Sequence, residues 1–145
     1  MKIVPFSEKH LDAVAEIERL TFSVPWTKEM LRESLALDMA HFLVCEENGV
    51  AVGYAGMYTS KYDGAITNVA VHPDFRSKGV GGAIMSALIE DGRKMKIEAL
   101  TLEVRVSNTR AQSFYERLGF ERVGTRRGFY SSPREDAVIM NYTYK

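Results

Sequence analysis

One segment restricts the fold of this chain more than any other, a glycine-rich loop between a strand and a helix. A predicted strand covers residues 65–71, and three glycines then fall within four residues at Gly79, Gly81 and Gly82. Apolar positions recur at helical spacing after them, and a further predicted strand covers residues 99–106. Two strands joined through a helix favour a right-handed crossover between parallel neighbours. We therefore expect an α/β unit with at least one parallel strand pair.

The other predicted strands are expected to pair in the antiparallel sense. Asn48-Gly49 joins two strand-like runs, a strong hairpin signal, and Asp63-Gly64 is predicted to form the next turn. The predicted strands cover residues 2–6, 41–46, 50–59, 65–71, 99–106, 120–126 and 137–144. With four predicted helices they indicate a three-layer α/β fold around a mixed, mostly antiparallel sheet. We expect one domain over residues 1–145.

Capping residues and apolar spacing define the predicted helices. Ser7 and Thr27 precede the first two helices, and Asn108 precedes the last, which Gly119 is expected to end. The residues expected to be buried are Leu11, Val14, Ala15, Ile17 and Leu20 in the first helix and Ile84, Met85, Leu88, Ile89 and Met95 in the third.

Composition excludes several classes of protein and of site. Lysine plus arginine (19) equals aspartate plus glutamate (19), so no overall field attracts nucleic acid or an anionic membrane. Cys45 is the only cysteine, and the three histidines lack metal-ligand spacing. No segment reaches the ~18 apolar residues of a spanning helix or resembles a secretory leader. We expect a cytoplasmic protein that needs no metal and binds neither nucleic acid nor membranes directly.

The glycine-rich loop predicts a phosphate site. The first N–H groups of a helix lack intrahelical partners, its dipole favours negative charge, and glycines let a phosphate approach the backbone. Arg76 and Lys78 add positive charge beside this loop. The alternative is a merely flexible loop, but each interior glycine weakens a helix by up to ~1 kcal/mol, which disfavours a purely structural use. The physical interpretation is a cradle for a pyrophosphate.

Two widespread nucleotide motifs do not fit this loop. The P-loop pattern G-x-x-x-x-G-K-[S/T] is absent. Gly79-x-Gly81 begins like a dinucleotide fingerprint, but Ile84 occupies its sixth position. The loop before Gly79 is also long and charged, where that fingerprint needs a tight turn. Glu103 could be matched to the ribose-binding acid of such a site, yet the loop argues against it.

Motifs spread over nearly the whole chain resemble the GNAT acetyltransferase superfamily. Arg76-x-x-Gly79-x-Gly81, between a strand and an amphipathic helix, resembles its pyrophosphate motif, and residues 102–108 and 114–120 resemble its second half. A narrower resemblance, to the bacterial ribosomal-protein-alanine N-acetyltransferases, rests on Pro25-Trp26 and on residues 126–130 and 135–140. Two positions depart from the family pattern: Gly82 stands where a basic residue is common, and Gly128 where asparagine is common.

This resemblance implies acetyl-coenzyme A as co-substrate, bound where two neighbouring parallel strands splay apart. The pantetheine is expected to pair with backbone of the strand before the loop, where an N–H group would also polarise the thioester carbonyl. The side chain of Asn108 is expected near the pantetheine. The residues expected to hold the co-substrate are Val69, Ala70, Val71, Ser77, Lys78, Gly79, Val80, Gly81, Gly82 and Asn108.

Acetyl transfer to an amine needs a base for the ammonium and an acid for the departing thiolate. Strand alternation places Glu103 on the face opposite Leu102, and the resemblance implies that it is the general base, acting through a water. The alternative is a solvated glutamate paired with Arg105. Tyr115, on the next helix, is expected to be the general acid. The alternative for Tyr115 is a plain core position beside Ala111.

The resemblance implies that the acceptor is the N-terminal α-amine of a protein, with the alanine terminus of a ribosomal protein as the expected target. An α-amine has a pKa of about 8, so it loses its proton more readily than lysine at about 10.4. A small-molecule amine N-acetyltransferase and a non-catalytic acyl-coenzyme A-binding module remain alternatives. Candidate acceptor-site residues are Trp26, Arg127, Phe129 and Tyr130, although Trp26 and Leu31 also have the spacing of a hydrophobic staple around Thr27.

Overall fold

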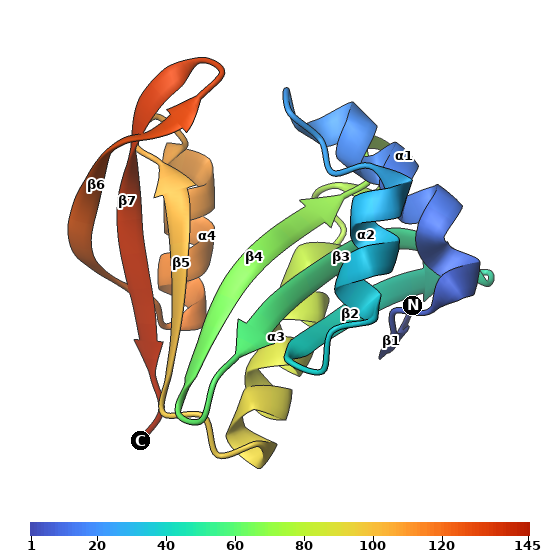
Figure 1. Cartoon of the computed structure of the whole chain (residues 1–145), viewed down its shortest axis with the longest axis horizontal. Coiled ribbons are helices and arrows are strands. Elements are labelled where there is room, and N and C mark those ends of the chain that lie inside the picture. The colour runs from blue at the N-terminus through green and yellow to red at the C-terminus, as the bar shows by residue number, and fades with distance from the viewer.

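The computed structural model describes all 145 residues as a seven-stranded sheet with helices on both faces (Figure 1). The spatial order of the strands is β1-β2-β3-β4-β5-β7-β6, and every neighbouring pair is antiparallel except β4 and β5. The strands are β1 (Lys2–Pro5), β2 (Ala40–Glu47), β3 (Val50–Thr59), β4 (Asp63–Val71), β5 (Ala99–Arg105), β6 (Glu121–Ser131) and β7 (Arg134–Thr143). The predicted order of elements and the mixed three-layer fold are confirmed.

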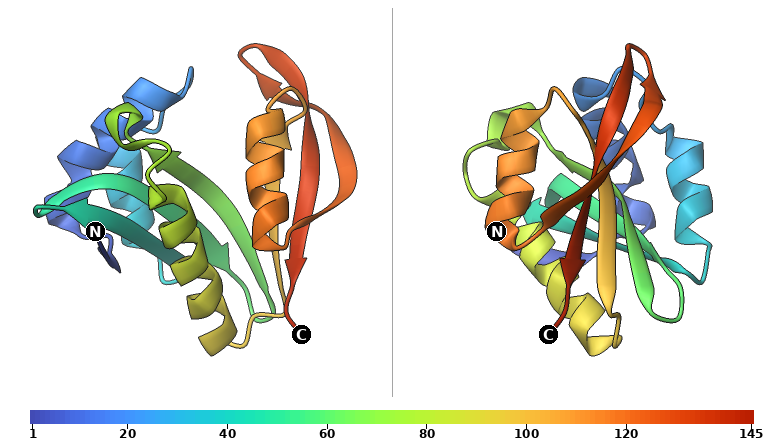
Figure 2. Two further views of the ribbon diagram at one scale, coloured as in Figure 1. Left: turned by 180° about the vertical axis from the view of Figure 1, so that it is seen from behind. Right: turned by 90° about the vertical axis from the view of Figure 1, so that its left-hand side faces the viewer.

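Four α-helices form the two outer layers. Helices α1 (Leu11–Thr21) and α2 (Lys28–Leu35) cover one face, and α3 (Val80–Lys94) and α4 (Thr109–Leu118) cover the other (Figure 2). Two single-turn 3-10 helices, η1 (Glu8–His10) and η2 (Pro73–Phe75), precede α1 and follow β4. No helix is long and apolar enough to span a membrane.

The parallel strands β4 and β5 are paired only where they begin. Their register covers three pairs, Asp63 with Ala99, Gly64 with Leu100 and Ala65 with Thr101. Beyond these pairs the strands separate, so the sheet divides into an N-terminal half-sheet (β1 to β4) and a C-terminal half-sheet (β5 to β7), as Figure 1 shows. The predicted splay is therefore confirmed, and it leaves a free strand edge on each side.

Just beyond this pairing, a β-bulge in β4 changes the face of the sheet to which its side chains point. Gly56 of β3 opposes Asn68 and Met57 opposes Ile66, so Thr67 is the extra residue on β4. Ile66 consequently joins the core beneath α3, whereas Ala70 joins the core beneath α1 and α2. Asn68, two residues before Ala70, faces the same side as Ala70. Strand alternation alone does not reveal this change of face.

Three sequence predictions about individual positions are wrong. Asp63-Gly64 forms no turn but belongs to β4, where a Cβ on Gly64 would lie 2.7 Å from Leu100 Cδ2. That glycine therefore serves close strand packing rather than chain reversal. Leu20 and Met95 are 40% and 42% exposed, because each lies at the end of its helix, beyond the sheet-facing stripe.

Candidate active site

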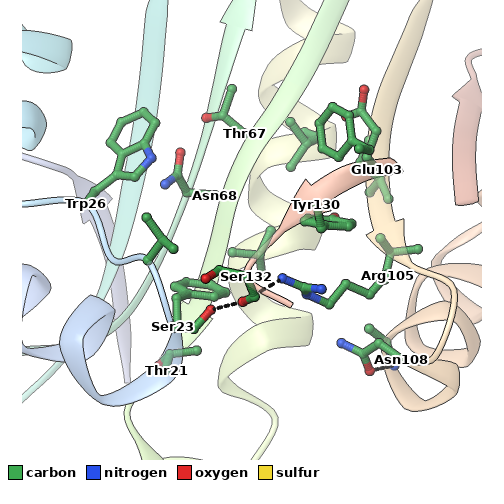
Figure 3. Close-up of a pocket in the computed structure, with 18 of the residues that line it drawn as sticks. Thr21, Ser23, Trp26, Thr67, Asn68, Glu103, Arg105, Asn108, Tyr130 and Ser132 are labelled. Carbon is green, nitrogen blue, oxygen red and sulfur yellow. Dashed lines mark hydrogen bonds between the residues drawn. The ribbon is translucent and has the colours of Figure 1, made fainter. Parts of the chain in front are cut away.

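A cleft of about 690 Å³ opens where β4 and β5 separate. Its wall on the N-terminal half-sheet comes from the bulged part of β4, the end of α1 and the α1–α2 loop. Its other wall comes from β5, α4 and the turn between β6 and β7. Figure 3 shows the side chains of both walls pointing into the space between them. The predicted residues Val69, Glu103, Asn108 and Tyr115 all line this cleft.

The free edge of β4 can accept a strand-like ligand. Residues 69–71 pair with β3 on one side, through Val69 with Ala55 and Val71 with Gly53. On the other side β5 is paired only as far as Ala65. Backbone groups on that edge have no strand partner, which is the arrangement expected for binding a pantetheine through main-chain hydrogen bonds.

The glycine-rich loop presents a continuous set of free amides at the start of α3. None of the N–H groups from residues 77–82 donates a hydrogen bond within the chain. Ser77 and Gly79 both have left-handed backbone, with φ of 63° and 80°. No atom within 4 Å would meet a Cβ on Gly79 or Gly82, so both glycines leave their surface open to a ligand. A diphosphate fits these donors and the helix dipole.

The two cations of this loop hold different positions. The Arg76 guanidinium donates to the Val71 carbonyl at 3.1 Å and to Thr21 Oγ1 at 3.3 Å, so it ties the end of β4 to α1. The Lys78 ammonium lies 5.4 Å from the centre of the Phe75 ring. Lys78 therefore remains near the free amides, whereas Arg76 is directed back toward the body of the protein.

Glu103 lies on the cleft face of β5 and is not paired with Arg105. Its side chain is 23% exposed, and its only cation neighbour is Arg126 Nη2 at 3.8 Å. Arg105 pairs instead with Glu135, with 3.0 Å between Nη1 and Oε1. The expected alternative, an ion pair between neighbouring strand positions, is therefore wrong, and Glu103 stays accessible to the cleft.

Tyr115 packs in the core and also lines the cleft. Its ring makes edge contacts with Phe114 and Phe120, at centroid distances of 5.2 and 5.7 Å. Burial raises the pKa of the Tyr115 phenol, and the nearby Tyr130 raises it further. The phenol is therefore protonated at neutral pH. A core position and a place in the cleft wall are compatible for Tyr115, because its ring packs against Phe114 and Phe120 while the residue also lines the cleft.

Asn108 begins α4 at the edge of the cleft. Its Oδ1 accepts a hydrogen bond from the Ala111 N–H at 3.1 Å, as expected for an N-cap, and Gly119 ends the helix with φ of 108°. The amide nitrogen of Asn108 is not used by this cap. It is therefore free to donate to a ligand in the cleft.

Two loops meet across the cleft, the α1–α2 loop and the β6–β7 turn. Arg105 donates to the carbonyls of Ser132 and Pro133 and lies 4.3 Å from the centre of the Tyr130 ring, so it holds the β6–β7 turn. Ser23 Oγ of the α1–α2 loop donates to the Ser132 carbonyl at 2.6 Å, across the cleft (Figure 3).

Three of the four candidate acceptor residues lie in the cleft, namely Trp26, Phe129 and Tyr130, whereas Arg127 is outside it. The staple interpretation of Trp26 also has support, since Trp26 packs against the same core cluster as Leu31. Gly128 has φ of 59°, a conformation that glycine and asparagine tolerate best, which explains why either residue suits this position.

A buried polar cluster on the β4 side of the cleft escaped the sequence analysis. Glu18 of α1 is 1% exposed and accepts hydrogen bonds from the Tyr54 hydroxyl and from the Trp26 N–H, the latter at 2.7 Å. Burial raises the pKa of Glu18, whereas Tyr54, Trp26 and Asn68 oppose that rise. The available signal was a carboxylate four residues after Val14 on the apolar face of the helix.

A cleft between splayed parallel strands that is lined by a carboxylate and a phenol, together with a helix that begins with free amides after the first of these strands, is the arrangement expected of an acyl-transferring enzyme. The sequence profile of the acetyltransferase (GNAT) family matches residues 11–120. The chain therefore belongs to this family and is an N-acetyltransferase.

Relatives with named activities agree with this assignment. The ribosomal protein bS18-alanine N-acetyltransferase of Escherichia coli is 33% identical over 90% of this chain and 88% of that protein. A Bacillus subtilis protein named as a candidate for the same activity is 38% identical over 90% of this chain and 87% of its own length. The crystal structure of the Escherichia coli ribosomal-protein-S18-alanine N-acetyltransferase superposes with a TM-score of 0.90, at 30% identity over 98% of this chain and 92% of that chain.

Proposed function

We propose that this enzyme acetylates the N-terminal α-amine of a protein, with the terminal alanine of ribosomal protein bS18 as its target. The observation that supports this most strongly is the cleft itself, which places Glu103 and Tyr115 in one space beside the free edge of β4. Relatives that are 32–38% identical carry this activity in their names. Acetyl-coenzyme A is the proposed acetyl donor, and action on a ribosomal protein would take place in the cytoplasm.

The proposed co-substrate site extends from the glycine-rich loop to Asn108. The free amides of residues 77–82 would hold the pyrophosphate, and the edge of residues 69–71 would pair with the pantetheine. A GNAT-family structure of Elizabethkingia anophelis, with acetyl-CoA bound, shares the fold at 17% identity and a TM-score of 0.79. An N–H group of the β4 edge would polarise the thioester carbonyl.

In the proposed reaction Glu103 takes the proton from the acceptor ammonium through a water. The neutral amine attacks the thioester carbon, so that a C–N bond forms as the C–S bond breaks. An α-amine has a pKa of about 8, so the base deprotonates it more easily than it would a lysine side chain, whose pKa is about 10.4. The partial exposure of Glu103 and its separation from Arg105 leave its carboxylate free for this task.

Tyr115 is the proposed acid for the departing thiolate. An ordinary phenol gives its proton to a thiolate at a cost of ~2 kcal/mol, from pKa values of about 10 and 8.5. Burial raises the pKa of Tyr115, which adds to this cost. We therefore expect Tyr115 to donate a hydrogen bond to the growing negative charge on sulfur, and to complete proton transfer only as the C–S bond breaks.

The proposal is tested by incubating the enzyme with acetyl-coenzyme A and a panel of acceptors, with mass detection. The panel contains peptides with different N-terminal residues, the same peptides with blocked N-termini and internal lysine, and small amines such as spermidine. Acetylation of free N-termini, with the alanine peptide preferred, is the expected result. Turnover of small amines alone would select the small-molecule alternative. Coenzyme binding with no turnover of any amine would select the non-catalytic one.

A further inference from the structure

Asn68 has a buried side-chain oxygen that no group of the protein satisfies. The residue is 6% exposed, and its Oδ1 has no hydrogen-bond partner. Asn68 nevertheless lines the cleft, and Figure 3 shows its amide beside Trp26. The large majority of buried side-chain polar atoms have a hydrogen-bond partner, and leaving one without costs about 1–3 kcal/mol. Such an oxygen in the wall of an active-site cleft points to a missing ligand donor.

The neighbours of Asn68 define the chemistry of that missing partner. Glu18 already accepts from the Tyr54 hydroxyl and the Trp26 N–H, and an acceptor cannot satisfy another acceptor. The partner of Asn68 Oδ1 must therefore bring an N–H or O–H group of its own. A carboxylate directly behind the site favours a cationic donor over a neutral one. An amine meets both conditions.

We propose that Asn68 binds the acceptor substrate, its Oδ1 accepting a hydrogen bond from an N–H group of the acceptor's N-terminal residue. Glu18 is the positioning residue of this subsite, because it holds Trp26 and Tyr54 around the Asn68 amide. The inference rests on the proposed function and adds a specificity determinant on the β4 wall, opposite Glu103 on β5. The acceptor amine would then lie between an amide oxygen on one wall and a base on the other.

The β-bulge at Thr67 is what makes this subsite possible. It turns Asn68 toward α1, away from the core beneath α3. The same bulge lies just beyond the last β4–β5 pair, so the side chains of β4 change face where the cleft begins. An amide there lies in a wall of the cleft, whereas an amide on the other face would lie under α3.

A binding role and a packing role for Asn68 differ in what Asn68→Leu does to the two substrates. The change removes the unsatisfied oxygen, but it also removes the amide that helps to lower the pKa of Glu18, so the melting temperature falls in either case. A binding role raises the peptide KM and leaves acetyl-coenzyme A affinity unchanged, whereas a packing role weakens the binding of both substrates. Asn141 offers a matched control, since its Oδ1 is also buried without a partner but it does not line the cleft.

The test compares wild type, Asn68→Leu, Asn68→Ala and Asn141→Leu in three measurements. These are the KM for an alanine-terminated peptide, the acetyl-coenzyme A affinity by calorimetry, and the melting temperature. We expect both Asn68 variants to raise the peptide KM about tenfold or more, which corresponds to ~1.4 kcal/mol. Acetyl-coenzyme A affinity should stay within about twofold, and Asn141→Leu should leave the peptide KM unchanged.

An unchanged peptide KM in both Asn68 variants overturns the inference. A lower melting temperature with weaker binding of acetyl-coenzyme A also overturns it, because the effect is then structural. Failure of the proposed function looks different, since wild type itself would then not acetylate peptides. In that case the same variants are assayed with spermidine, whose amines offer the same N–H donors, and an unchanged KM there refutes the role of Asn68.

Discussion

Replacing Tyr54 with phenylalanine tests whether the buried cluster behind the cleft holds a charged carboxylate. Tyr54 is fully buried, and its hydroxyl donates to Glu18, which is 1% exposed. The substitution removes one oxygen atom and no methyl group, so it opens no significant cavity. Glu18 keeps the Trp26 N–H and the Asn68 amide but loses the Tyr54 hydroxyl. A hydrogen bond to a charged group contributes about 1.5–3 kcal/mol, so we expect unfolding free energy at pH 7 to fall by about that amount.

The loss should depend on pH, because Glu18 titrates. Burial raises the pKa of folded Glu18 above its ordinary value of 4.5, so the protonated group favours the folded state. That favourable contribution is complete below pH 4.5 and is lost as the pH rises through the folded pKa. Tyr54 lowers the pKa of Glu18, so Tyr54→Phe raises it further. The variant should therefore lose least stability near pH 4 and most at neutral pH.

Chemical denaturation at pH 4 and pH 7.5 measures this difference directly. At pH 7.5 a loss of about 2 kcal/mol also lowers the melting temperature by roughly 4–8 °C for a chain of this size. Tyr62→Phe is the matched control, because Tyr62 is 49% exposed and should change stability by less than about 0.5 kcal/mol. A loss for Tyr54→Phe that is no larger than the control, or one that is equal at both pH values, would refute the reasoning.

Three further predictions concern the reaction and the co-substrate. Glu103→Gln should lower turnover and move the pH optimum upward, toward the α-amine pKa of about 8, because only amine that is already neutral then reacts; an unchanged pH–rate profile would remove Glu103 as the base. Tyr115→Phe should lower kcat about 10²-fold in steady-state assays with little change in acetyl-coenzyme A affinity, and an unchanged kcat would contradict its role as acid. Gly79→Ala and Gly49→Ala both place a side chain at positive φ, 80° and 81°, in open space, so each should cost about 1–2 kcal/mol of stability. Only Gly79→Ala should weaken acetyl-coenzyme A binding in calorimetry, and equal affinity in the two variants would argue against the phosphate cradle.

The sequence alone was sufficient for features that depend on local patterns. Hydrophobic periodicity predicted every strand and helix in the right order, and the caps at Thr27, Asn108 and Gly119 are where their residue types predicted them. The glycine-rich run predicted a helix start with free amides, which is what α3 has. These features follow from contacts within a few residues, which the order of amino acids contains directly.

The tertiary structure alone decided which distant groups meet. Glu18 accepts a hydrogen bond from Tyr54, which lies 36 residues further along the chain. Arg105 pairs with Glu135, 30 residues away, rather than with Glu103, two residues away. The bulge at Thr67 reverses the faces of β4, so Asn68 reaches the cleft although nothing in its own strand marks it. Such pairings depend on how twisted strands and helices pack in three dimensions, and a buried polar group takes whichever partner that packing brings within reach. Local pattern therefore predicted the helix start with its free amides and several residues of the cleft, and only packing revealed the buried cluster of Glu18, Tyr54 and Asn68.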